Sequence, residues 1–220
     1  MREIVKLLSV NVSLPKVVTA SGERVETGIF KKPVAGPVAV KTLNLEGDLQ
    51  ADLSVHGGPD KAVYVYSWKN FEYWREALRR DDLGPGTFGE NFTVDELPEN
   101  EVSIGDELEI GTARFLVTQP RLPCLKLGIA LARPDFPRVF HHSGRNGFYL
   151  RVLQEGKVDA GDAIRKIEPS NGSRMTIAEF VRIAISKSFT AEELDRVLSL
   201  PALPRSWKDH LAAKNQARHT

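Results

Sequence analysis

The segment 119–124, with the sequence Gln-Pro-Arg-Leu-Pro-Cys, holds the single cysteine of this 220-residue chain. A thiolate is both a nucleophile and a soft metal ligand, and a nearby cation or helix N-terminus favours it. Arg121 and Lys126 supply cations, and Pro123 can begin a helix that places the sulfur of Cys124 near its positive end. A lone cysteine is also commonly a small buried apolar residue. The residues alone therefore leave a functional and a structural role open.

Two glycine-containing loops carry further chemical groups. In residues 56–61, His56 and Lys61 lie on either side of a Gly-Gly turn and could supply a proton or contact an anion, although a plain exposed turn is the alternative. Residues 84–92 contain the spacing G-x-G-x-x-G, but a predicted helix precedes it and a predicted strand follows, the reverse of a dinucleotide-binding motif. Its backbone N–H groups, together with Asn91, could instead cradle an anion or the edge of a heterocycle.

A third polar segment, 141–151, is rich in cationic and amide side chains. His141 and His142 are adjacent, and adjacent side chains diverge on a helix and face opposite sides of a strand, so they rarely bind one metal ion. Arg145 and Arg151 are candidate anion contacts. The serine in this segment lacks the G-x-S-x-G elbow of a hydrolase.

Composition narrows the function classes. A formal net charge of +1 argues against an electrostatic nucleic-acid binder, which needs a strongly basic face. One cysteine excludes an internal disulfide framework and a multi-cysteine zinc site. The N-terminal residues lack the apolar core of a signal peptide, and no apolar run approaches the ~20 residues that span a bilayer. We expect a cytoplasmic protein with no membrane contact.

The elements that must position these groups are mainly short strands with a few helices. Ser67 is a plausible N-cap for a helix over 69–80 that buries Phe71 and Trp74. Many short strands at this spacing suggest a barrel, so we predict a mainly β fold with helices, of the α+β class. The predicted strands, rich in β-branched and aromatic residues and separated by Gly and Pro, are 4–12, 28–32, 38–42, 62–67, 92–97, 107–110, 114–118, 148–154 and 163–167.

The pattern changes at residues 168–173, a polar run with Pro and Gly that is typical of a linker. We therefore divide the chain into a barrel domain, 1–168, and a linker with a small helical domain, 169–220. Two segments in the second part match the capping box: Thr176 with Glu179, and Thr190 with Glu193. A third helix is expected from Ser206 to Lys214. Three short helices are a marginal fold alone, so we expect them to pack on the barrel or on a second subunit, as in a homodimer.

The segments 56–63, 86–92 and 119–124 together resemble the motifs of the MOSC domain, in its YiiM-like branch. The resemblance spans about the first 168 residues, and the helical tail is similar to the small three-helix domain of that branch. It implies a β-barrel related to the C-terminal domain of molybdenum-cofactor sulfurase, holding a pyranopterin molybdenum cofactor, with Cys124 as the molybdenum ligand.

The resemblance also implies an activity, the reduction of N-hydroxylated compounds such as hydroxylamino purines to amines, with electrons from an external reductase. A soft thiolate suits a metal already held by the two sulfurs of the pterin. The expected proton donors are His56 and then Glu90. The residues expected to hold the cofactor are His56, Lys61, Gly89, Asn91, Phe92 and Arg121, with Arg145, Arg151 and Lys31 as weaker candidates.

Two other functions remain open at this point. Cys124 could carry a persulfide and pass sulfur to a metal–sulfur assembly, or the domain could bind and store the cofactor without turnover. A carrier cysteine needs exposure, and the apolar neighbours of Cys124 favour a cleft instead.

Overall fold

The computed structural model describes residues 4–20, 22–51, 57–167, 174–186 and 189–216. Its main feature is an eight-stranded sheet in which all neighbours are antiparallel except β6 and β7, which are parallel. The strand order is β12 (Ile164–Ile167), β8 (Glu107–Ile110), β9 (Ala113–Pro120), β10 (Phe148–Gln154), β6 (Val63–Ser67), β7 (Phe92–Val94), β1 (Leu7–Val12) and β4 (Lys32–Val34). Two small sheets pair β5 (Val38–Val40) with β11 (Gly156–Val158), and β2 (Lys16–Ala20) with β3 (Glu23–Thr27).

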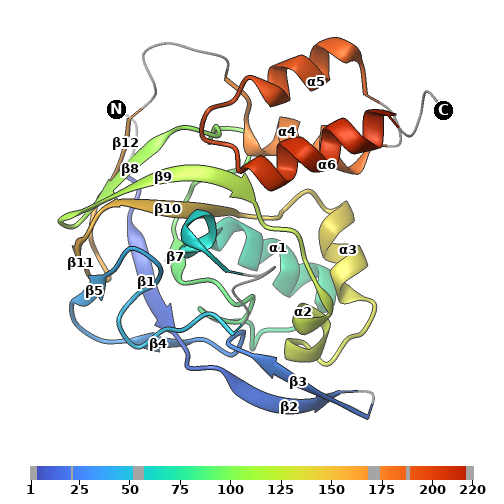
Figure 1. The fold of residues 1–220 in the computed structure, drawn as a ribbon. Coiled ribbons are helices and arrows are strands. Elements are labelled where there is room, and N and C mark those ends of the chain that lie inside the picture. Colours follow the sequence, from blue (N-terminus) through green and yellow to red (C-terminus); the bar gives the residue numbers. More distant parts are fainter. Residues whose placement is uncertain (1–3, 21, 52–56, 168–173, 187–188, 217–220) are drawn as a thin grey trace.

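The sheet curls back on itself (Figure 1). An antiparallel bridge joins Lys6, just before β1, to Ala163, just before β12 at the far edge. The amide of Leu7 donates to the carbonyl of Asp162 at 2.9 Å, which adds a second link. The α+β class is confirmed, and the predicted barrel takes the form of this curled sheet with isolated links between β1 and the start of β12.

Most predicted strands lie within a few residues of an observed one, but the strand predicted over 28–32 is wrong. The backbone leaves β3 at Thr27 and enters β4 only at Lys32. The amide of Lys31 donates to the carbonyl of Ile29 at 2.9 Å, a tight turn that interrupts a strand here. At Gly28 an added Cβ would lie 2.9 Å from the carbonyl oxygen of Leu49, so only glycine fits this close approach of two backbone segments. The hairpin β2–β3 was not predicted.

Three helices enclose an aromatic cluster beside the sheet: α1 (Trp68–Leu78), α2 (Leu125–Ala130) and α3 (Phe136–His142). Phe71 and Trp74 are buried there as predicted, and the ring of Trp74 meets that of Phe136 edge-on at 4.9 Å. Ser67 occupies the N-cap position of α1, but its hydroxyl donates to the carbonyl of Asp95 at 3.3 Å instead of capping the helix. α3 was not predicted.

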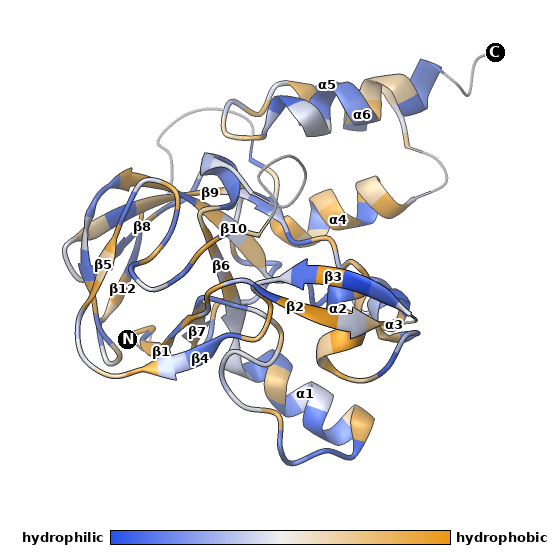
Figure 2. Ribbon diagram, turned by 60° about the horizontal axis from the view of Figure 1, so that its bottom comes forward, coloured by the Kyte–Doolittle hydropathy of each residue, from blue (hydrophilic) through white to orange (hydrophobic). Residues whose placement is uncertain are grey.

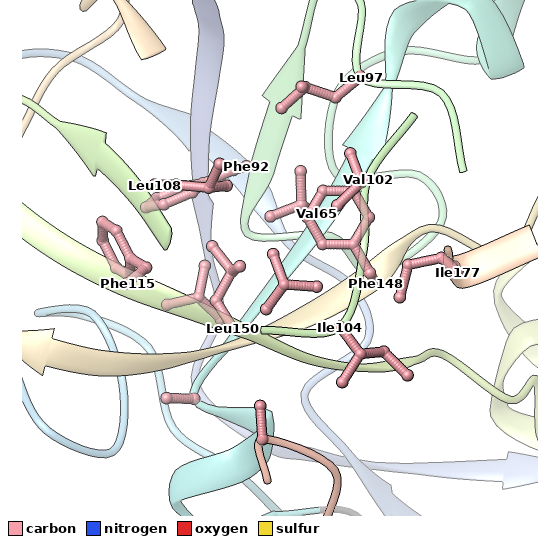
Figure 3. Close-up of a cluster of buried hydrophobic side chains, with 14 of the residues drawn as sticks. Val65, Phe92, Leu97, Val102, Ile104, Leu108, Phe115, Phe148, Leu150 and Ile177 are labelled. Carbon is pink, nitrogen blue, oxygen red and sulfur yellow. The ribbon is translucent and has the colours of Figure 1, made fainter. Parts of the chain in front are cut away.

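The helical tail packs on the sheet, as in the first of the two placements expected from sequence. It consists of α4 (Ile177–Ile185), α5 (Ala191–Leu198) and α6 (Arg205–Gln216), drawn in orange to red in Figure 1. Ile177 is fully buried and lies near Phe148 and Ile104 of the sheet domain (Figure 3). Burying one such side chain contributes about 1.5–3 kcal/mol. Figure 2 shows α4 as mainly hydrophobic, as this contact requires.

Both predicted capping boxes are present. The hydroxyl of Thr176 accepts from the amide of Glu179 at 3.1 Å, and Thr190 accepts from Glu193 in the same way. The third helix begins at Arg205, one residue before the predicted start at Ser206. The predicted linker, 168–173, lies outside the described residues. Within the described ranges, no helix is both long enough and apolar enough to cross a membrane.

Candidate functional site

A cleft of about 720 Å³, open to solvent, lies between the end of β9, the loop after β3 and the turn before β6. It brings together six residues predicted from separate motifs, which lie in its wall: Lys31, Lys61, Gly89, Asn91, Arg121 and Cys124. Among the described residues, four lysine or arginine side chains line the cleft, against one carboxylate, that of Asp48. Such a lining favours an anionic ligand.

Cys124 lies at the point where β9 has ended and α2 begins. It has extended backbone dihedrals at the N-cap of α2, and its carbonyl accepts from the amide of Leu127 at 3.0 Å. The helix predicted after Pro123 is therefore confirmed. The cysteine is half-buried and forms no disulfide. Cys124 lines the cleft together with Arg121 and Lys126, and it interacts electrostatically with Arg121.

Arg121 is a buried cation, only 5% exposed. Its guanidinium carbon lies 5.0 Å from the ring centre of Tyr64 and 5.6 Å from that of Phe140. Burial tends to lower the pKa of Arg121, but electrostatic interactions with Tyr64, Tyr149 and Cys124 raise it, and the net shift is upward. Arg121 therefore stays positive.

One nitrogen of that guanidinium lacks a hydrogen bond among the described residues. Atom Nη1 of Arg121 is buried and has no hydrogen-bond partner within the part of the chain that the structure describes. A buried donor without a partner costs about 1–3 kcal/mol. Because Arg121 also lines the cleft, a ligand oxygen bound there could satisfy this nitrogen.

A second cation, Lys31, is already neutralised. Its ammonium group forms an ion pair with Asp48, and both side chains are at most 9% exposed. Burial lowers the pKa of Lys31, while Asp48 opposes that shift. The other oxygen of Asp48 accepts from the side-chain amide of Asn91 at 2.9 Å, and the oxygen of that amide accepts from the backbone of Tyr64 at 3.0 Å. Lys31 and Asn91 thus hold the cleft wall in place, which leaves Arg121 as the better-placed anion contact.

Two side chains, Gln50 and Arg151, hold the turn that carries Lys61 in place. The side-chain amide of Gln50 accepts from the backbone of Gly58 at 2.8 Å and donates to the carbonyl of Lys61 at 3.1 Å. Arg151 forms an ion pair with Asp60 in the same turn, its Nε lying 2.6 Å from the carboxylate. Arg151 therefore positions the turn, and it is not among the residues that line the cleft. Its predicted contact with the cofactor is replaced by this supporting role.

Glu90 is also placed differently from the prediction. Its carboxylate is fully buried and accepts from the amides of Gly86 and Phe88 and from the hydroxyl of Thr93 at 2.8 Å. Burial raises its pKa to about 7, although these hydrogen bonds oppose the shift. Glu90 does not appear in the described lining of the cleft. It holds the bend 86–89 behind the wall, a placement that favours a positioning role over the predicted role of proton donor.

Two further predicted contacts are not brought to the cleft. Phe92 is fully buried in the sheet core, edge-on to Phe115 at 5.6 Å between ring centres. Arg145 donates to the side chain of Asn70 at 3.0 Å and lies over the ring of Tyr73. Both residues were predicted as cofactor contacts because they follow or lie within polar motifs. In the structure, Phe92 on β7 points into the sheet core, and Arg145 packs against α1. His56, the first predicted proton donor, lies outside the described residues.

The structure places in the cleft four residues that were not among the predicted site residues. Lys126 and Tyr149 line the cleft with Cys124, and Asp48 and Gln50 complete its wall. Lys126 was named as a cation beside the cysteine and Tyr149 lies in the polar segment 141–151, but neither was predicted as a site residue, and no motif contained Asp48 or Gln50. Burial raises the pKa of Tyr149, so its hydroxyl keeps its proton at neutral pH.

The donor set does not form a metal site by itself. The described residues contain no group of three or more His, Cys, Asp or Glu side chains that could hold a metal ion. Cys124 can contribute one soft ligand, which suits a metal that arrives with further sulfur ligands. The unpartnered nitrogen of Arg121 and the cationic lining suit the anionic part of such a cofactor.

Comparison with known proteins identifies the family of each part of the chain. Residues 52–165 match the MOSC domain family, and residues 175–214 match the YiiM-like, 3-alpha helix domain family. The chain is 36% identical to the Escherichia coli protein YiiM over 82% of this chain and 81% of that protein. It is 29% identical to a Gibberella moniliformis protein named Reductase, over 91% of this chain but 39% of that protein. The crystal structure of YiiM from Geobacillus stearothermophilus superposes with a TM-score of 0.80 at 36% identity, over 96% of this chain and 98% of that one.

Proposed function

The chain belongs to the MOSC domain family and carries a YiiM-like three-helix domain, and from that membership we propose that it is a molybdenum-cofactor-dependent reductase of N-hydroxylated compounds. The observation that carries the proposal is the cationic cleft in which the thiol of Cys124 lies beside buried Arg121, whose Nη1 lacks a partner within the described part of the chain. The fungal relative named Reductase supports the reaction class.

Different residues of the cleft are proposed to contact different parts of the cofactor. Cys124 offers its sulfur to the metal, while Arg121, Lys61 and Lys126 face the anionic groups. Gly89 allows the backbone to bend at φ +78°, and an added Cβ would lie 2.7 Å from the side chain of Ile29 in the cleft wall. The cofactor, when bound, supplies two-electron redox chemistry, which no side chain of the cleft provides.

The net reaction converts an N–OH group to N–H plus water, with the uptake of two electrons and two protons. His56 remains our proposed proton donor, since Glu90 supports the bend behind the wall instead. The protonated hydroxyl of Tyr149 lines the cleft with Cys124 and can donate a hydrogen bond to the substrate oxygen. We propose that the electrons come from a separate reductase, in the cytoplasm, where reducing conditions keep a lone thiol free.

The test begins with the molybdenum and pterin content of the protein purified from cells with and without cofactor synthesis. We expect both in the wild type and neither metal nor activity in Cys124→Ala. Leu125→Ala is the matched control, because this neighbour is 62% exposed and lies outside the described lining of the cleft. Reduction of a hydroxylamino purine is then measured with an artificial electron donor.

Three results would contradict the proposal. Wild-type protein without molybdenum, when made in cells that synthesise the cofactor, would remove the cofactor assignment. Full retention of the metal in Cys124→Ala would remove the ligand assignment. A persulfide mass shift on Cys124, in protein that reduces no substrate, would replace the reductase with a sulfur carrier.

A further inference from the structure

A second hollow adjoins the first cleft at Cys124 and lies between the end of β9 and helix α6 of the tail. Its volume is about 860 Å³, including space open to solvent. It shares Lys61, Leu122, Cys124 and Tyr149 with the first cleft. From α6 it receives Ser206, Trp207 and His210, which are spaced along one helix face. The cysteine is thus the meeting point of a cationic cleft and a partly aromatic hollow.

The ring of Trp207 is held in a fixed orientation beside this hollow. Its indole N–H donates to the side chain of Gln119 at 2.8 Å, and Gln119 in turn donates to the carbonyl of Asp60 at 3.2 Å. Phe180 of α4 meets the ring edge-to-face, with 5.0 Å between ring centres. These contacts preorganise a flat apolar surface, and a bound ligand does not have to order it.

The remaining walls define the chemistry of the occupant. His210 stands edge-on to Trp207 at 5.9 Å, and Pro120, Leu122 and Pro123 provide apolar surface. Polar groups lie among them, on Lys61, Gln119, Tyr149, Ser206 and His210. Small-molecule sites combine apolar and aromatic walls with polar groups that orient the ligand, and aromatic side chains stack on the faces of bases.

We propose that this second hollow binds the substrate, a planar heteroaromatic N-hydroxylated base that stacks on Trp207 and directs its N–OH group towards Cys124. The inference rests on the proposed function, because it assigns the first cleft to the cofactor and the second to the substrate. It also gives the helical tail a role: α6 supplies the surface that selects flat substrates over small non-aromatic ones.

The first experiment measures binding, independently of turnover. The full-length protein, purified with and without the cofactor, is titrated calorimetrically with adenine and 6-hydroxylaminopurine. We expect Trp207→Leu to weaken binding by about tenfold, within the range for the loss of one stacked base, while Trp207→Phe keeps most of the affinity. His210→Ala, at an exposed position, should weaken it about threefold. Asp209→Ala, also exposed on α6 but outside the described lining, is the control with unchanged affinity.

The second experiment uses the cofactor-loaded enzyme. Trp207→Leu should raise KM for 6-hydroxylaminopurine by about tenfold, with kcat and the turnover of hydroxylamine, which has no ring to stack, nearly unchanged. Equal purine affinity in Trp207→Leu and wild type would overturn the inference, as would an equal loss for both substrates. If the protein held no molybdenum but still bound purine through Trp207, the proposed function would be refuted and the substrate site would stand. The two proposals can therefore fail separately.

Discussion

Replacing Glu90 by Gln tests the role that the structure assigns to this buried carboxyl group. Its pKa of about 7 in the folded protein lies above the ordinary value of 4.5. The folded state therefore retains a proton that the unfolded state releases first as the pH rises. The stabilisation from this proton is fully present below pH 4.5 and is lost as the pH rises through about 7. At 1.36 kcal/mol per pKa unit, the loss amounts to about 3 kcal/mol, most of it between pH 5 and 7.

The assay is urea unfolding of the wild type and Glu90→Gln from pH 4.5 to 8. The variant should lack the pH-dependent loss, so that its free energy of unfolding gains about 3 kcal/mol relative to the wild type across this range. A constant offset of about 1–3 kcal/mol is also expected, because the new amide group faces the N–H of Phe88 in place of an acceptor oxygen. Glu76→Gln, exposed on α1, controls for the loss of a carboxyl group.

Parallel pH profiles for the wild type and Glu90→Gln would refute this reasoning, because they would mean that Glu90 stays ionised among its three hydrogen bonds. Activity provides a separate check on the role. If Glu90 were the proton donor, Glu90→Gln would keep its molybdenum and lose about 10²–10⁴-fold in kcat. A positioning residue predicts instead that any lost activity follows lost cofactor.

Two further predictions concern the backbone. Gly89→Ala should destabilise the protein by more than the roughly 1–2 kcal/mol cost of a left-handed residue, because its Cβ would also lie 2.7 Å from the side chain of Ile29. Gly144→Ala is the control, because Gly144 has φ +70° and open space around it, so this variant should show the backbone strain alone. Equal losses of unfolding free energy in urea for the two variants would argue against the contact with Ile29. Thr176→Ala should lose about 1 kcal/mol with the capping hydrogen bond, whereas Thr176→Ser should retain it; equal unfolding midpoints for the two variants would mean that the cap contributes nothing.

The features predicted correctly from sequence depend on residues close together in the chain. The capping box at Thr176 needs a glutamate three residues on, and the helix after Pro123 needs only the fixed φ of proline and the apolar residues that follow. The β-strands follow from short runs of β-branched and aromatic residues. For the cap and the helix, the interacting residues lie within one or two turns, so the pattern itself contains the interaction; for a strand, the pattern indicates only the extended backbone, and the partner strand lies elsewhere in the chain.

The site residues show the same difference between what residue types indicate and what the fold determines. Sequence motifs were sufficient to select Cys124, Arg121 and Lys61, because cations around a lone cysteine are visible as residue types. They could not separate a residue that faces the cleft from one that supports it. Glu90 and Arg151 carry the right chemistry, but one is buried behind the wall and the other is paired with Asp60. Side-chain direction depends on which strands pair, and that is settled only in the folded chain.

The sequence by itself therefore determined which chemistry this protein can perform: a soft thiol among cations, next to glycine-rich bends, in a chain without a second cysteine. The tertiary structure decided which of these side chains line a cleft and which lie behind its wall. The clearest case is Trp207, which stands 88 positions from its hydrogen-bond partner Gln119 yet lines a hollow with Cys124. No local pattern can encode such a contact, because it arises only when the apolar faces of the helical tail are buried against the sheet.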